Sequence, residues 1–148
     1  MKTEVNKKKL TRRGVLSAAA AAVPAATAMA APPPGVKLPD LVYSEANAKV
    51  TREPFGDLRI YFEGPTDQLA SMTAGSLRLK AGMSPHPPHK HPEEEFMVIT
   101  EGNGEISIDG RITRVGPGAM MYCAGNKLHG IVNTGKTSLL FYFYKWQK

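Results

Sequence analysis

Turn-forming residues divide most of this chain into short segments, and this division limits its possible folds more than any other feature. Between residues 64 and 135, glycines and Gly-Pro pairs recur at short intervals and separate apolar or alternating runs. No helical period is sustained after residue 40, apart from one turn near residues 67–70. The pattern predicts an all-β sandwich or barrel, and a small barrel can hold one small ligand. We expect strands at residues 58–63, 76–80, 95–101, 104–108, 111–115, 119–123, 129–133 and 138–145.

Length and composition are those of one ordinary globular domain. With 148 residues, of which 42% are hydrophobic and 22% charged, the composition argues against a disordered chain and against a polytopic membrane protein. A single cysteine excludes an internal disulfide framework and a cysteine-rich zinc module. We expect a barrel over residues 41–148, preceded by a proline-rich leader at residues 31–40.

The net charge of +6 comes almost entirely from the N-terminus. Residues 1–30 contain six of the 19 Lys and Arg residues but one of the 13 Asp and Glu residues. The remainder, with 13 basic and 12 acidic residues, is nearly neutral. Because a nucleic-acid-binding domain needs a basic surface, we expect no nucleic-acid partner.

Residues 1–30 also have the pattern of a cleaved export signal. A basic stretch precedes an uncharged one at residues 14–36, and Ala30 closes a small-residue cleavage pattern. The pair Arg12-Arg13 stands at the border of the two stretches, as in a twin-arginine signal. The alternative is a chance pair of arginines in an ordinary secretory signal. We expect a periplasmic or otherwise extracytoplasmic protein, exported by the twin-arginine route.

The uncharged stretch is poorly suited to span a membrane. Nine of the 17 residues at 14–30 are alanine, which contributes little transfer energy, and Pro24 interrupts the stretch. Stable insertion needs about 20 predominantly apolar residues. No stable membrane span is therefore expected.

Residues 82–102 contain three of the four histidines. His89 and His91 are two residues apart, so in an extended chain they point to the same side, and Glu95 lies on that side if the strand continues. Two imidazoles and a carboxylate converging from one strand would form a metal site. The alternative is a charged, proline-rich surface loop with incidental histidines. His86 breaks the alternation and is expected to be a loop residue at the barrel mouth.

The fourth histidine, His129, stands at the head of an apolar run. Taken alone, it would be interpreted as a hydrogen-bonded core residue. The histidines of the first segment make it a candidate metal ligand.

Together, the two segments resemble the two motifs of the cupin superfamily. The first motif, with its glycine, His-x-His, glutamate and second glycine, corresponds to Gly82, His89, His91, Glu95 and Gly102. The second motif, aligned on Gly118, reaches Ala124, Asn126, His129 and Asn133. The chain has one extra residue before His89, and Ala124 and Asn126 stand where the motif has Pro and Gly. Asn can replace Gly in a left-handed turn, so these departures concern the turn and not the ligands.

The resemblance implies a single-domain cupin, which is a jelly-roll or double-stranded β-helix barrel. It also implies one divalent metal inside the barrel, held by His89, His91, Glu95 and His129. Four protein donors on an octahedral ion leave two positions for water, oxygen or a bidentate substrate. Such donors suit manganese, iron, nickel, zinc or copper. Manganese or iron is expected if the protein folds and takes up its metal before export.

Two functions are open. Dioxygenases, isomerases and lyases all occur among cupins, so one hypothesis is a metal-dependent enzyme acting on a small oxygen-rich molecule. The other is a non-catalytic protein that binds a metal, a sugar or a sugar acid, since fold does not determine function. Apolar inward-facing residues beside a full ligand set would favour catalysis, and a polar, wide-open pocket would favour carbohydrate binding.

Three further features each have an expected role. Cys123 is expected to be a small buried hydrophobic residue, with thiol chemistry as the alternative, and either it or Tyr122 must face inward. The apolar run at residues 139–144 predicts either a central strand packed on both faces or a dimer interface, and we expect a homodimer. Glu93 and Glu94 are expected at a solvated rim.

Overall fold

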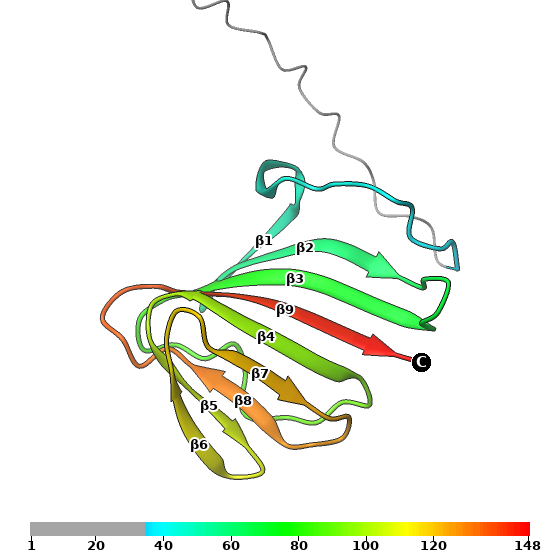
Figure 1. Ribbon diagram of the computed structural model, residues 1–148. Coiled ribbons are helices and arrows are strands. Elements are labelled where there is room, and N and C mark those ends of the chain that lie inside the picture. The colour runs from blue at the N-terminus through cyan, green and yellow to red at the C-terminus, as the bar shows by residue number, and fades with distance from the viewer. Residues whose placement is uncertain (1–34) are drawn as a thin grey trace, which may run out of the picture.

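The computed structural model describes residues 35–148 and shows an all-β fold in which two antiparallel sheets face each other (Figure 1). The larger sheet has the order β1-β2-β3-β9-β4-β7, and the smaller has the order β6-β5-β8. The strands are β1 (Lys49–Glu53), β2 (Gly56–Gly64), β3 (Ser71–Leu79), β4 (Glu94–Glu101), β5 (Gly104–Ile108), β6 (Arg111–Val115), β7 (Met120–Cys123), β8 (His129–Val132) and β9 (Leu139–Gln147), after a short 3-10 helix, η1 (Glu45–Asn47). The predicted signal at residues 1–30 lies outside the described residues.

The expected all-β fold is confirmed, but some strand limits differ from those expected. Strand β1 was not predicted, because four of its five side chains are exposed and no apolar alternation marks it. Strand β3 begins five residues before the expected start at residue 76, in a stretch where all residues but Met72 are small or polar. Residues 67–70 form a bend and not the expected helical turn. The Thr66 N–H donates to the Leu69 carbonyl, and the Thr66 hydroxyl accepts from the Gln68 and Leu69 N–H groups.

Strand β9 is a central strand of the larger sheet, hydrogen-bonded to β3 on one side and to β4 on the other. Its residues Leu139, Leu140, Phe141 and Phe143 are all buried. The run is therefore a central strand, as one of the two interpretations expected, but its outer face is not fully covered, because Tyr144 is 43% exposed there.

The hydrophobic core lies between the two sheets and continues along the inner face of β4. Met97 and Ile99 are buried there, and Ile106 and Ile131 face them from the smaller sheet. On β7, Cys123 is 2% exposed and Tyr122 is 51% exposed, so the cysteine is the inward residue. Burial raises the pKa of the Cys123 thiol, which makes it less reactive. Within residues 35–148 no helix is long and apolar enough to cross a membrane.

Candidate metal centre

The backbone of His129 anchors the candidate site. His129 is the first residue of β8 and lies opposite Ile108 of β5. On its other side it forms an isolated antiparallel bridge with His89, in which each N–H donates to the other residue's carbonyl at 2.9 and 3.0 Å. This bridge fastens the loop that contains His89 to the smaller sheet, while Glu95 comes from β4 in the larger sheet.

The condition that the strand continues from His89 to Glu95 is not met. Strand β4 begins only at Glu94, and the histidines lie in the preceding loop. Prolines at positions 85, 87, 88 and 92 have no N–H to donate, so this segment cannot maintain a strand ladder. The bridge to His129, and not strand alternation, brings the loop histidines to the site.

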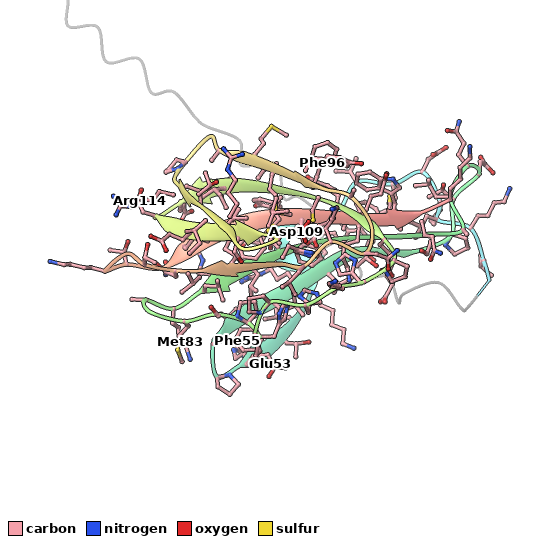
Figure 2. All side chains as sticks on the ribbon, turned by 90° about the horizontal axis from the view of Figure 1, so that it is seen from below. Glu53, Phe55, Met83, Phe96, Asp109 and Arg114 are labelled. Atoms are coloured by element: carbon pink, nitrogen blue, oxygen red, sulfur yellow. The ribbon has the colours of Figure 1, made fainter. Side chains whose placement is uncertain are left out.

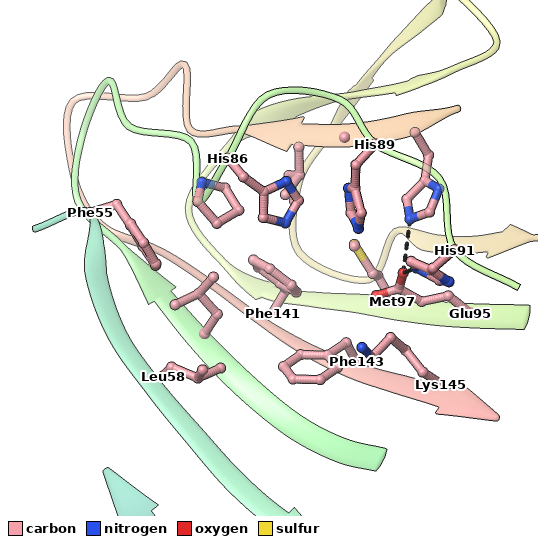
Figure 3. Close-up of a pocket in the computed structure, with 15 residues that line it drawn as sticks. Phe55, Leu58, His86, His89, His91, Glu95, Met97, Phe141, Phe143 and Lys145 are labelled. Atoms are coloured by element: carbon pink, nitrogen blue, oxygen red, sulfur yellow. Dashed lines mark hydrogen bonds and ion pairs between the residues drawn. The ribbon is translucent and has the colours of Figure 1, made fainter. Parts of the chain in front are cut away.

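The structure nevertheless brings all four predicted side chains together (Figure 3). One ring nitrogen from each of His89, His91 and His129 lies within 4.8 Å of the others, a spacing that could hold a metal ion. The Glu95 Oε2 atom lies 3.1 Å from the Nε2 atom of His91 and 3.0 Å from that of His129. Both Glu95 and His129 are buried, at 4% and 1% exposure.

Backbone carbonyls determine which nitrogen of two rings faces the centre. The Nδ1 atom of His129 donates to the Lys127 carbonyl at 2.9 Å, and that of His91 donates to the Glu93 carbonyl at 3.1 Å. In a neutral ring the N–H is then on Nδ1, and Nε2 presents a lone pair. Both Nε2 atoms point at a carboxylate oxygen, which also offers only lone pairs. These facing lone pairs repel one another unless protons are added to the rings or one cation lies between them. The donor set therefore fits a metal ion.

His89 differs from the other two histidines because its Nδ1 atom is buried without a hydrogen-bond partner. Burial, together with the nearby rings of His86, His129 and His91, lowers the pKa of His89 to about 4. The ring is therefore neutral at physiological pH. An unpartnered buried nitrogen on a neutral imidazole is suited to ligate a metal.

Glu95 and His129 form a coupled pair. Burial acts to raise the pKa of Glu95, but hydrogen bonds from His129 and His91 outweigh it, and the pKa is lowered overall. The same hydrogen bond to Glu95 raises the pKa of His129. Glu95 is thus ionised at neutral pH, as a carboxylate ligand must be.

The four side chains lie at one end of a cavity of about 180 Å³. Most of its other walls are apolar, formed by Phe55, Leu58, Leu77, Met97, Ile131, Phe141 and Phe143. The cavity therefore combines an apolar lining with a complete donor set, the combination stated above as favouring catalysis.

A family model described as "Cupin domain" matches residues 75–144. This match to the cupin family covers 70 of the 148 residues. Among solved structures, the barrel is similar to an RmlC-like cupin from Shewanella frigidimarina, with 13% identity and a TM-score of 0.61 over 76% of this chain and 96% of the other. KdgF from Halomonas sp. is 18% identical, with a TM-score of 0.62 over 74% and 96% of the two chains. A predicted oxalate decarboxylase from Thermotoga maritima is 20% identical, with a TM-score of 0.60 over 73% and 100%.

At these identities the structural likeness shows the cupin fold alone. No curated protein matches the chain by sequence. Asn126, which stands where the second cupin motif has Gly, adopts the left-handed conformation expected of it, with a φ of 64°. Its N–H donates to the His91 carbonyl at 2.7 Å, so the turn of the second cupin motif also supports a candidate ligand of the first.

Residues outside the predicted set also shape the cupin pocket. His86 lies in the loop as expected, but its ring packs edge-on against His89 at 4.0 Å between centroids and lines the cavity. Glu93 is half-buried, and its carboxylate lies 3.2 Å from His91 Nδ1, so it is more than a solvated rim residue. Lys145 lines the same cavity and was missed. Alternation along β9 could have predicted this position of Lys145, because Phe141, Phe143 and Lys145 share one face of the strand.

Proposed function

We propose that this chain is an exported cupin enzyme that holds one divalent metal and acts on a small oxygen-rich molecule, as a dioxygenase, isomerase or lyase. The proposed ligands are His89, His91, Glu95 and His129. The convergence of three ring nitrogens and one carboxylate at the end of an apolar pocket carries the proposal. A protein of the same fold is described as a predicted oxalate decarboxylase, and a small carboxylate as substrate would agree with that description.

The chain's own residues have separable tasks in this proposal. A divalent ion held here would polarise a substrate oxygen as a Lewis acid. The carbonyls of Glu93 and Lys127 orient the two Nε2 atoms by holding the Nδ1 protons. The apolar walls exclude water from the bound molecule. Glu95 is placed to accept a substrate proton whenever its carboxylate is not used as a ligand.

The test is elemental analysis of the purified protein, followed by titration of metal-free protein with Mn²⁺ and with Zn²⁺. The wild type is expected to bind one equivalent. His89→Ala and His129→Ala should each weaken binding by at least about a hundredfold, because each removes one ligand of a four-ligand site. His86→Ala is the matched control, a neighbouring histidine outside the cluster, and should bind within about threefold of the wild type.

Because His129 is buried, thermal unfolding of each variant must first establish that it is folded. His89 is more accessible than His129, so His89→Ala offers a second variant if His129→Ala does not fold. A folded His129→Ala protein with full metal content and unchanged affinity would show that the four-ligand site is wrong.

Manganese or iron is the proposed native metal, with zinc, nickel or copper as the other candidates. A site of imidazole and carboxylate donors binds copper and zinc more tightly than manganese, so affinity alone would not select manganese. If the protein folds in the cytoplasm before twin-arginine export, the metals available there would determine which ion occupies the site. We expect exported protein to contain manganese or iron, and protein secreted unfolded by the general route to contain copper or zinc. The same metal by both routes would refute loading before export.

We also propose that the chain is a homodimer. An aromatic patch on the outer face of the larger sheet supports this: Phe96, Tyr122 and Tyr144 are 36%, 51% and 43% exposed and lie opposite one another on β4, β7 and β9. Figure 2 shows Phe96 on one side of the molecule and Phe55 and Met83 on the other. Sedimentation velocity should give a dimer for the wild type and a monomer for Phe96→Glu. A monomeric wild type at micromolar concentration would refute the proposal.

A further inference from the structure

The cupin pocket has two chemically different ends. Figure 3 shows Phe55 and Leu58 at one end, and His91, Glu95 and Lys145 at the other. The first end can contact only the apolar part of a ligand. The second end carries the four proposed metal ligands and, in addition, Lys145.

Lys145 belongs to this polar end because of its position in the sheet. It lies directly opposite Glu95 on the neighbouring strand, and it shares the inner face of β9 with Phe141 and Phe143. Side chains opposite each other on antiparallel strands have Cβ atoms about 5 Å apart. The Lys145 ammonium is therefore held beside the candidate metal centre, and its charge acts on His129.

Lys145 has no counter-ion within residues 35–148. It makes no side-chain hydrogen bond or ion pair there, although its side chain is half-buried. Glu95, the acid opposite, is engaged instead through Oε2 with His91 and His129. A divalent ion with one carboxylate ligand would leave the centre positively charged, and Lys145 adds to that charge. A partly desolvated ammonium beside a cationic centre is stabilised by an anionic ligand.

We infer that Lys145 anchors the anionic group of the ligand, and that the ligand class is a small carboxylate with an apolar body. The inference rests on the proposed function and narrows its substrate class. The carboxylate lies between Lys145 and the metal centre, and the apolar body lies against Phe143, Leu58 and Phe55. A cavity of about 180 Å³ matches one ring or a short branched chain, since an apolar cavity of about 150 Å³ holds benzene.

The experiment measures binding of three probes to the Co²⁺-loaded protein by calorimetry and by the visible spectrum of cobalt. Phenylacetate has both the charge and the apolar body, phenylacetamide has the body without the charge, and acetate has the charge without the body. We expect phenylacetate to bind most tightly. Lys145→Met should weaken phenylacetate binding by roughly tenfold and change phenylacetamide binding by less than about twofold, because it removes one charge contact. Lys145→Arg should restore most of the affinity.

Metal affinity provides a readout that a purely structural role would not produce. Removing a neighbouring cation should leave Co²⁺ affinity unchanged or raise it in Lys145→Met, while phenylacetate affinity falls. Equal losses for phenylacetate and phenylacetamide, or no loss for either, would refute the inference. If the wild type takes up no metal, the proposed function is wrong. The carboxylate–amide comparison in metal-free protein then decides on Lys145 alone, where loss of discrimination in Lys145→Met supports the inference and unchanged discrimination refutes it.

Discussion

Replacing Asn133 by alanine should cost the domain a large part of its stability. Asn133 follows β8 and is fully buried, at 0% exposure. Its Nδ2 donates to the Leu79 carbonyl at 3.1 Å and to the Thr137 carbonyl at 2.8 Å, and its Oδ1 accepts from the Gly135 N–H at 2.9 Å. One side chain thus ties β3 to the connection between β8 and β9.

The expected loss follows from these three hydrogen bonds. Each net bond contributes about 1 kcal/mol, so Asn133→Ala should lower the free energy of unfolding by about 3 kcal/mol. A total stability of about 5–15 kcal/mol makes this a large fraction. Asn133→Asp keeps an acceptor for Gly135 but places a buried carboxylate against two carbonyl oxygens. It should therefore be less stable than Asn133→Ala at neutral pH, although it is closer in shape to the wild type.

Urea unfolding followed by fluorescence and circular dichroism measures the effect through the midpoint and the slope. Thr134→Ala, at the exposed neighbouring position, is the matched control and should change stability by less than about 0.5 kcal/mol. A loss below about 1 kcal/mol for Asn133→Ala, or an Asn133→Asp protein as stable as the wild type, would show that these bonds do not contribute as reasoned.

Three other changes have definite expected outcomes. Gly75→Ala should lower the melting temperature by several degrees, since its Cβ would overlap the Phe143 Cζ atom and the Arg59 carbonyl oxygen; an unchanged melting temperature would contradict the packing. Replacing Arg12 and Arg13 by lysine should leave an unprocessed precursor in the cytoplasm, as seen by fractionation, whereas an ordinary secretory signal would tolerate the change. Metal affinity should fall as the pH drops through the raised pKa of His129, because the metal must displace that proton; titrations at two pH values that agree would argue against His129 as a ligand.

Much of the fold was predictable because turn residues mark the ends of most strands. The elements that were missed lack such a signal. Strand β1 is exposed and charged, and it is a strand only because β2 offers its edge for hydrogen bonding. Apart from Met72, the first half of β3 consists of small or polar residues, and it is held in place by pairing with β2 and β9 on its two sides. Long-range pairing, and not local propensity, determines both.

The identity of the four candidate ligands could be predicted from the sequence, but the way in which their side chains come together could not. The spacing of His89, His91 and Glu95 indicated a possible metal site, and the resemblance to the cupin motifs added His129. How they meet depends on the backbone bridge between His89 and His129, which joins residues 40 positions apart and leaves no local trace in the sequence. The carbonyls that orient His91 and His129 belong to loop residues whose side chains carry no information about that role.

The residues most suited to select the ligand lie outside the segment that matches the cupin family. Phe55 and Leu58 precede residue 75, and Lys145 follows residue 144, yet all three line the same cavity as the candidate metal centre. A match to the family can therefore point to the metal-binding residues without pointing to the residues that contact the bound small molecule. Lys145 extends β9 by the alternation already set by Phe141 and Phe143. The strand needed for the core therefore also positions at the centre a lysine that has no counter-ion within residues 35–148. Ligand choice in this barrel is accordingly expected to change with Phe55, Leu58 and Lys145 while the four candidate ligands stay the same.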